Sequence, residues 1–181
     1  MFIRSERLFL RPGWPEERPE LHALLADEAI VGNLATLPWP LAEARCEGAP
    51  RDRRLPHFLI TLPGADGARL VGSIGLGIDD GDVELGYWIA RPYWGQGYAT
   101  EAARAVITQA RAIGHRRLVA THFLENPASG RVLQKVGFRP AGEVRQRYSM
   151  GRDEIAPALR YALCLGEPGD CGDDEPAMRA A

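Results

Sequence analysis

A turn with two glycines, followed directly by an amphipathic helix pattern, constrains the fold of this chain more than any other feature. The turn is Trp94-Gly95-Gln96-Gly97-Tyr98-Ala99. Apolar residues then recur at the spacing i, i+3, i+4, i+7, i+8 and i+11, which is typical of one face of a helix. The pattern predicts a helix over 99–114 with the turn at its N-terminal end. The apolar residues are Ala99, Ala102, Ala103, Val106, Ile107 and Ala110.

The chemistry of this turn suits an anion. The first N–H groups of a helix have no partner within it, and the helix dipole adds partial positive charge there. Gly95 and Gly97 let the backbone approach an anion closely, and Ala99 leaves the next amide accessible. The P-loop and dinucleotide fingerprints do not match the turn. The sequence therefore predicts a phosphate site, with the alternative that the glycines only let the chain turn.

Short apolar runs and helical patterns alternate along the rest of the chain. The runs 57–62, 69–78 and 83–90 are separated by turn sequences and predict an antiparallel meander. The order predicts a mixed α/β fold in one domain over 1–166, with a mobile tail over 167–181 that lacks apolar periodicity. Further strands are expected at 3–12, 118–124, 138–150 and 157–165, and further helices at 16–27 and 127–136.

Composition and charge narrow the classes of partner. The net charge is -2 and 45% of the residues are hydrophobic, so neither a nucleic acid nor a membrane surface is an expected partner. No run approaches 18 apolar residues, and the N-terminal segment is too charged for a signal peptide, so we expect a cytoplasmic protein. Cys46, Cys164 and Cys171 have no metal-ligand spacing, and we interpret them as reduced thiols.

Two motifs agree with one known family. The first is Glu84-Leu85-Gly86-Tyr87-Trp88-Ile89, which runs into Tyr93-Trp94-Gly95-Gln96-Gly97-Tyr98-Ala99-Thr100-Glu101-Ala102. The second is Asn126-Pro127-Ala128-Ser129, followed by Lys135-Val136-Gly137-Phe138. Over 3–165 the chain resembles the GNAT superfamily of acetyltransferases, particularly the branch of ribosomal-protein alanine N-acetyltransferases. The resemblance implies an α/β (α+β) fold with a mixed, mostly antiparallel central sheet flanked by helices.

The same resemblance implies acetyl-CoA as the cosubstrate, held by its pyrophosphate at the glycine turn. The cysteine spacing gives no reason to expect a metal. The family's turn usually begins with Gln or Arg, whereas Trp94 stands there in this chain. We therefore expect the turn to hold the pyrophosphate through backbone amides rather than through that side chain. The implied cofactor contacts are Ile89, Gly95, Gln96, Gly97, Tyr98, Ala99, Thr100 and Asn126.

Ser129 is the expected proton donor to the departing thiolate. Many members of the family use a Tyr two residues before the Lys of the second motif, but Leu133 stands there in this chain and cannot donate a proton. The resemblance implies that Asn126 hydrogen-bonds the pantetheine arm. A purely structural interpretation stays open, because Asn126 and Pro127 also suit the start of a helix.

Glu84 is the leading candidate for the general base. It precedes the phosphate turn on the strand that, by resemblance, lines the transfer site, but it could equally be solvated or paired with an Arg. His122 and water are the other candidates. A lysine side chain costs about 4.6 kcal/mol to deprotonate at pH 7 and an α-amine only about 1 to 1.4 kcal/mol, so the acceptor decides how strong a base is needed.

The sequence thus predicts the transfer of an acetyl group from acetyl-CoA to a primary amine by direct attack. The acceptor is either a protein N-terminus or a small-molecule amine, and the expected acceptor loops, 29–54 and 145–154, contain no pattern that chooses between them. The assembly is left open, with a homodimer as one option. The alternative function is a catalytically silent CoA-binding sensor or interaction module.

Overall fold

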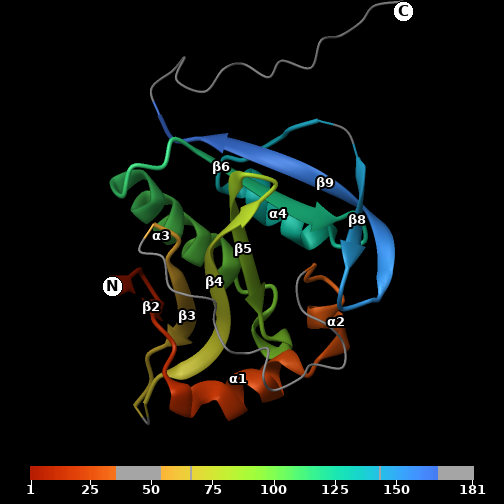
Figure 1. Cartoon of the computed structure of the whole chain (residues 1–181). Coiled ribbons are helices and arrows are strands. Elements are labelled where there is room, and N and C mark those ends of the chain that lie inside the picture. Colours follow the sequence, from red (N-terminus) through yellow and green to blue (C-terminus); the bar gives the residue numbers. More distant parts are fainter. Residues whose placement is uncertain (36–53, 66, 143, 167–181) are drawn as a thin grey trace, which may run out of the picture.

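The computed structural model describes residues 1–35, 54–65, 67–142 and 144–166. Within these ranges nine strands form one sheet in the order β1-β2-β3-β4-β5-β6-β9-β7, and β8 also pairs with β9 (Figure 1). Only β5 and β6 run parallel among the described strand pairs, which confirms the predicted mostly antiparallel sheet. The strands are β1 Ile3–Arg4, β2 Phe9–Arg11, β3 His57–Leu62, β4 Arg69–Asp79, β5 Asp82–Ile89, β6 Arg117–Phe123, β7 Arg139–Pro140, β8 Arg145–Ser149 and β9 Glu154–Cys164.

Helices cover both faces of the sheet. On one face α3 and α4 pack against the main core, and on the other α1 and α2 form a smaller apolar cluster with Trp88 (Figure 1). Short 3-10 turns, η1 and η3, precede α1 and the phosphate turn. Their bounds are η1 Pro15–Glu17, α1 Arg18–Leu25, α2 Glu28–Val31, η3 Arg91–Tyr93, α3 Tyr98–Ala112 and α4 Pro127–Lys135.

The predicted helix over 99–114 is confirmed by α3, and its apolar face is the reason that it packs where it does. Five of the six residues at helical spacing are buried against the sheet, and the sixth, Ala99, is partly buried. The facing strand residues include Leu76 of β4 and Leu85 of β5, which lie opposite each other in the antiparallel register. Burying this face fixes the N-terminal end of α3 beside the end of β5.

The sheet opens between β5 and β6. These two strands are joined at one pair of residues, Glu84 and Val119, whereas β6 and β9 are paired over the whole length of β6, from Arg117 to Phe123. Beyond Glu84 the remainder of β5 has no strand partner on that side among the described residues. The opening lies between the N-terminal ends of α3 and α4 and creates room inside the sheet.

Three predicted elements differ from the structure. The expected strand at 3–12 is a hairpin, because Ser5 and Leu8 close a turn with N–H to O and side-chain hydrogen bonds. The expected strand at 138–150 is split into β7 and β8, with Gly142 at a φ of 94° between them. The expected helix at 16–27 ends at Leu25, and a separate α2 follows, capped by Asp27.

Cys164, at the end of β9, is disulfide-bonded, so the expectation of reduced thiols is wrong for this residue. Residues 167–181, the predicted tail, and most of the predicted acceptor loop 29–54 lie outside the described residues. Across the described ranges, none of the helices combines the length and the apolar character needed to cross a membrane.

Candidate active site

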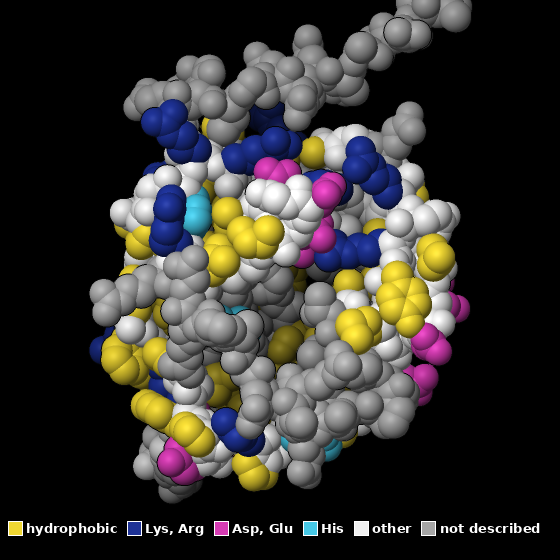
Figure 2. All heavy atoms as spheres, viewed as in Figure 1, with side chains coloured by type: hydrophobic (Ala, Val, Ile, Leu, Met, Phe, Trp, Pro, Cys, Tyr) yellow, Lys and Arg dark blue, Asp and Glu magenta, His cyan; other side chains and the backbone are white. Residues whose placement is uncertain are grey.

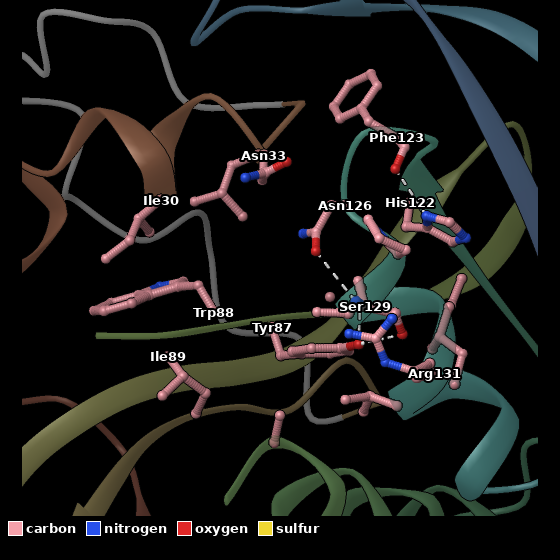
Figure 3. Close-up of a pocket in the computed structure, with 18 of the residues that line it drawn as sticks. Ile30, Asn33, Tyr87, Trp88, Ile89, His122, Phe123, Asn126, Ser129 and Arg131 are labelled. Atoms are coloured by element: carbon pink, nitrogen blue, oxygen red, sulfur yellow. Dashed lines mark hydrogen bonds between the residues drawn. The ribbon is translucent and has the colours of Figure 1, made fainter. Parts of the chain in front are cut away.

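A pocket of about 680 Å³ occupies the opening between β5 and β6. Its walls come from the second half of β5, the end of β6 and the first turns of α3 and α4. Figure 2 shows a hollow near the middle of this face, with hydrophobic side chains visible at depth. In Figure 3, Tyr87 points toward Ser129 of α4, whereas the neighbouring Trp88 points toward Ile30 of α2. The pocket is therefore reached by residues from both faces of the sheet.

The turn with two glycines, Trp94 to Ala99, is called the phosphate turn here and forms one end of this pocket. Gly95 and Gly97 have φ angles of 74° and 82°, in the left-handed region that favours glycine. Gly97 is the N-cap of α3 and provides no side-chain hydrogen bond to the helix. None of the amides from Gly95 to Thr100 donates to a backbone carbonyl among the described residues. A row of N–H groups without a backbone acceptor, with the helix dipole behind it, is an arrangement that favours an anion.

Side chains hold the outer part of the turn in place. Trp94, which is 48% exposed, donates its indole N–H to the carbonyl of Ile89 at 2.5 Å, so it links the turn to the end of β5. The side chain of Gln96 donates to the carbonyl of Pro92 at 3.1 Å. Of the predicted cofactor contacts, Gln96 does not line the pocket, while Ile89, Gly95, Gly97, Tyr98, Ala99, Thr100 and Asn126 do.

A pair of hydroxyl groups lies farther along the pocket. The hydroxyl of Tyr87 is 2.8 Å from Oγ of Ser129 and donates to the carbonyl of Ser129 at 3.2 Å. Asn126 caps α4, because its Oδ1 accepts from the backbone N–H of Ser129 at 3.2 Å. The cap uses the amide of Ser129 and leaves its hydroxyl available. Capping and a chemical role for Ser129 are thus compatible.

Tyr87 stays protonated at any ordinary pH. Burial raises the pKa of Tyr87 to about 12, against the smaller opposing effect of its hydrogen bond with Ser129. Its phenol is therefore a permanent donor for the Ser129 pair. Leu133, which stands where other family members have a Tyr, is 1% exposed and packs in the main core.

Glu84 lies at the point where β5 and β6 separate, and it is paired. Both of its carboxylate oxygens accept from the guanidinium of Arg147 on β8, at 2.9 and 3.2 Å, and Arg147 also contacts Asp79. Burial acts to lower the pKa of Arg147, but Glu84 and then Asp79 raise it above its ordinary value. The structure supports the alternative of pairing with an Arg, and the role of Glu84 as base stays a prediction.

His122 of β6 lies in the pocket wall and is 8% exposed. Its Nδ1 is 2.8 Å from the carbonyl of Phe123, and because a carbonyl only accepts, Nδ1 carries the proton in the neutral ring. Nε2 has no hydrogen-bond partner among the described residues, and it lies 2.7 Å from the position that a Cβ on Gly130 would take. The ring therefore packs directly against α4.

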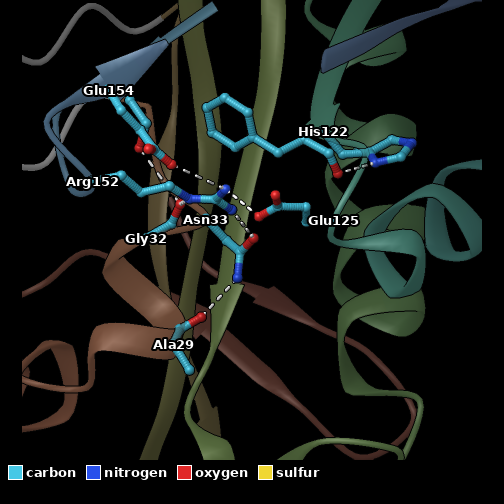
Figure 4. A network of polar contacts seen from close by, with 9 residues as sticks. Ala29, Gly32, Asn33, His122, Glu125, Arg152 and Glu154 are labelled. Carbon is cyan, nitrogen blue, oxygen red and sulfur yellow. Dashed lines mark hydrogen bonds and ion pairs between the residues drawn. The ribbon is translucent and has the colours of Figure 1, made fainter. Parts of the chain in front are cut away.

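Arg152 links the β8–β9 connection to the α2 end of the pocket (Figure 4). Its guanidinium donates to the carbonyl of Gly32, to Glu125 and, at 3.2 Å, to Oδ1 of Asn33. It also lies 5.0 Å above the ring of Phe123. Asn33 and Glu125 both line the pocket, so this network fixes polar groups at its α2 side.

Sequence reasoning left several of these residues without a role. Tyr87 belongs to the first motif, and strand alternation puts it on the face opposite Glu84, toward α3 and α4. Arg147 and Arg152 lie far from the motifs along the chain, and only the folding of the β8–β9 hairpin beside β5 and α2 brings them to the site. No local pattern marks either residue.

Comparisons with known proteins identify the family of the chain. A family model described as "Acetyltransferase (GNAT) domain" matches residues 7–139. The Bacillus subtilis protein "Uncharacterized N-acetyltransferase YoaA" is 36% identical over 85 residues, which are 45% of this chain and 48% of that protein. The chain thus spans about half the length of this curated relative.

Solved structures share the whole fold. An acetyltransferase (GNAT family) from Bacillus anthracis aligns with a TM-score of 0.73 and 25% identity, over 91% of this chain and 99% of its own. The ribosomal L7/L12 α-N-protein acetyltransferase RimL, solved in complex with coenzyme A, aligns with a TM-score of 0.69 and 21% identity, over 91% and 98%. Because the family match runs from the first hairpin to β7, the chain belongs to the GNAT family of acetyltransferases.

Proposed function

We propose that this protein transfers an acetyl group from acetyl-CoA to a primary amine, without a covalent enzyme intermediate. One observation carries the proposal: a single pocket joins the uncapped N-terminus of α3 to the hydroxyl pair of Tyr87 and Ser129. An anion site and a proton donor at two ends of one slot suit a long donor with a phosphate at one end and a thioester at the other.

The residues present fit acetyl-CoA in both charge and shape. The free amides from Gly95 to Thr100 match a pyrophosphate, and a side chain at Gly95 or Gly97 would have to adopt a strained positive φ. Beyond Glu84 this edge of β5 pairs with no described strand, which suits an extended arm with amide groups, and at its end the carbonyl of Ile89 is already taken by Trp94. Asn126, whose Oδ1 is used by its cap, still has its amide N–H groups to donate to that arm.

Ser129 is the proposed proton donor in the transfer. The amine nitrogen attacks the thioester carbonyl, the new C–N bond forms, and the C–S bond breaks to leave a thiolate. Ser129 gives its hydroxyl proton to this sulfur, while Tyr87 turns its own proton from the Ser129 carbonyl to Oγ and supports the resulting charge. The proton lost by the amine leaves through water and finally restores the neutral Ser129.

Glu84 is the proposed partner of the incoming amine. Its carboxylate lies on the same face of β5 as Trp88, opposite Tyr87, so an amine near Glu84 approaches the slot from the α1–α2 side. Accepting a full proton would weaken its ion pair with Arg147, so we propose that it draws the amine proton into a water molecule. An α-amine costs only about 1 to 1.4 kcal/mol to deprotonate at pH 7, which suits a base of this kind.

The acceptor we favour is therefore a protein N-terminus, met in the cytoplasm. The name of RimL states that it acetylates ribosomal L7/L12, and its fold is shared over 91% of this chain. Lysine side chains are the poorer acceptor, because the site has no unpaired carboxylate among the described pocket residues that could take up the larger deprotonation cost. A small α-amine would meet the same chemistry and competes with this assignment.

Two measurements test the proposal. Calorimetry with CoA and acetyl-CoA measures binding, and thiol release with N-terminal peptides, small amines and lysine analogues measures turnover. We expect binding of both cofactors and release with an α-amine. Binding without release on any acceptor would instead indicate a CoA sensor, and failure to bind CoA would overturn both functions.

A further inference from the structure

The turn of the N-terminal hairpin packs against the phosphate turn, about ninety positions away along the chain. Arg7, between β1 and β2, donates from Nη1 to the carbonyl of Gln96 at 3.0 Å. Its guanidinium carbon lies 4.6 Å from the centre of the Tyr98 ring, and its Nη2 is 3.5 Å from where a Cβ on Gly97 would be. Arg7 does not line the pocket, so it supports the phosphate turn from behind.

The hydrogen bond from Arg7 also sets the orientation of the N–H of Gly97. The carbonyl of Gln96 and the N–H of Gly97 belong to the same planar trans peptide, so they point in opposite directions. Holding the carbonyl toward Arg7, outside the pocket, therefore directs the N–H of Gly97 toward the other side. Gly97 lines the pocket, and its N–H has no backbone acceptor among the described residues.

Glu101 in the first turn of α3 fixes Arg7 in this position. Its carboxylate accepts from the backbone N–H of Arg7 at 2.7 Å, from Nε of Arg7 at 2.8 Å and from Oγ of Ser5 at 2.7 Å. Burial acts to raise the pKa of Glu101, but the hydrogen bonds from Arg7 and Ser5 outweigh it and keep this pKa below its ordinary value. Glu101 therefore holds both the backbone and the guanidinium of Arg7 in place.

We propose that Arg7 is a positioning residue that sets the Gly97 amide toward the pyrophosphate of the donor. This inference rests on the proposed use of acetyl-CoA. Glycine at 97 needs such support, because its backbone populates many conformations when nothing restrains it. The side chain of Trp94 does not give this support, because its indole N–H donates to the carbonyl of Ile89.

The rival explanation is that Arg7 only fastens the hairpin to α3. The positioning role and the fastening role predict different results for an acetyl donor without a pyrophosphate. We therefore compare Arg7→Met with wild type on acetyl-CoA and on acetyl-pantetheine, which carries the same thioester. The matched control is Arg91→Met, because Arg91 also pairs with a carboxylate, Asp27, and lies 5.7 Å from an aromatic ring, that of Trp94.

We expect Arg7→Met to weaken CoA binding and to lower kcat/KM for acetyl-CoA about tenfold, the factor that corresponds to 1.4 kcal/mol. Its kcat/KM for acetyl-pantetheine should stay within about twofold of wild type, and Arg91→Met should stay within the same range on both donors. Arg7→Lys should recover less than half of the loss, because an ammonium cannot hold Glu101 and the Gln96 carbonyl in one planar fork.

An equal loss on both donors would overturn the positioning role and leave the fastening role. Full recovery of kcat/KM for acetyl-CoA in Arg7→Lys would show that Arg7 acts through its positive charge and not through the geometry of its guanidinium. Wild-type protein that fails to bind CoA would refute the proposed function itself, which is a different outcome from wild-type binding that Arg7→Met does not alter. Thermal unfolding of each variant identifies any that fails to fold, and Glu101→Gln then tests the same contact from the other partner.

Discussion

The N-termini of α3 and α4 both border the pocket, yet they are built in opposite ways. Helix α4 begins with Asn126 as its cap and Pro127 in its first turn, so its first amides are satisfied or absent. Helix α3 begins with Gly97 in the left-handed region, and no side chain caps it. The difference shows that a helix start becomes an anion site only when the sequence withholds a cap. The capped helix presents a side chain, Ser129, and the uncapped one presents its backbone.

Gly97→Val should produce the largest loss of CoA affinity, because it changes the uncapped start of α3. A β-branched residue is strained at a φ of 82°, and its side chain blocks access to the amides. Losing two charge-assisted hydrogen bonds at about 1.5 kcal/mol each corresponds to a more than 100-fold loss of CoA affinity, measured by calorimetry. Gly114→Val is the control, because Gly114 follows the other end of α3 with a φ of 91°. Both variants should lose stability, and a similar loss of affinity in Gly114→Val would contradict the assignment.

Ser129→Ala tests the side chain that α4 presents. We expect kcat to fall about 100-fold, the lower range for a positioned proton donor, while the affinity for CoA stays within about twofold. The cap should survive, because Asn126 accepts from the backbone N–H of residue 129. Thr108→Ala removes a comparable helical hydroxyl on the exposed side of α3 and should leave kcat unchanged. Wild-type kinetics for Ser129→Ala would remove Ser129 from the mechanism.

Tyr87→Phe should have a smaller effect on the same step. The change removes one hydrogen bond to Ser129, so we expect about a tenfold loss in kcat. In the double variant with Ser129→Ala, the second loss should nearly vanish, because both residues act on one proton. Fully additive losses would separate the two roles.

The pH dependence of stability checks the environment of Tyr87 independently. Its pKa in the folded protein, about 12, lies above the unfolded value of about 10, so its contribution is complete below pH 10 and is lost as the pH rises toward 12. The difference in unfolding midpoint between wild type and Tyr87→Phe should therefore change across this window and stay constant below it. A difference that stays constant across this window as well would show that Tyr87 is not buried in solution.

Asn126→Ala should give the smallest effect. Removing an N-cap side chain costs about 1 kcal/mol of unfolding free energy, which chemical denaturation measures. Asn126→Asp retains the accepting oxygen and is the matched comparison, since it should restore most of this stability. If Asn126 also holds the substrate arm, Asn126→Asp should still raise the KM for acetyl-CoA, because a carboxylate has no N–H to donate.

Local patterns were sufficient for several elements, including α4, which carries Ser129. Strand β3 at His57–Leu62 and helix α4 at Pro127–Lys135 lie where alternation, proline and glycine predicted them. The errors lie where a side-chain hydrogen bond or a glycine with a positive φ interrupts regular structure. Ser5 closes a hairpin turn inside the expected first strand, and Gly142 interrupts the expected strand at 138–150. Both are tertiary or turn effects that hydrophobic periodicity does not contain.

The residues of the candidate site also fall into those that the sequence predicts and those that only the fold reveals. The glycine turn and Ser129 were recognisable because each carries its chemistry in a short segment. The pairing of Glu84 with Arg147, and the contact of Arg7 with Gln96, join residues that are more than sixty positions apart. Such contacts depend on which hairpin packs beside which strand, so one sequence without its fold could not reveal them.

The single pairing between β5 and β6 has a mechanical consequence. One part of the sheet contains β1 to β5 and the other contains β6 to β9. In the described sheet, Glu84 and Val119 form the only strand pairing between these two parts. A ligand in the pocket contacts both parts of the sheet and binds the folded state, so it raises the unfolding midpoint by an amount that grows with the logarithm of its concentration over its Kd. The thermal unfolding midpoint therefore reports how fully the pocket between the two parts is occupied.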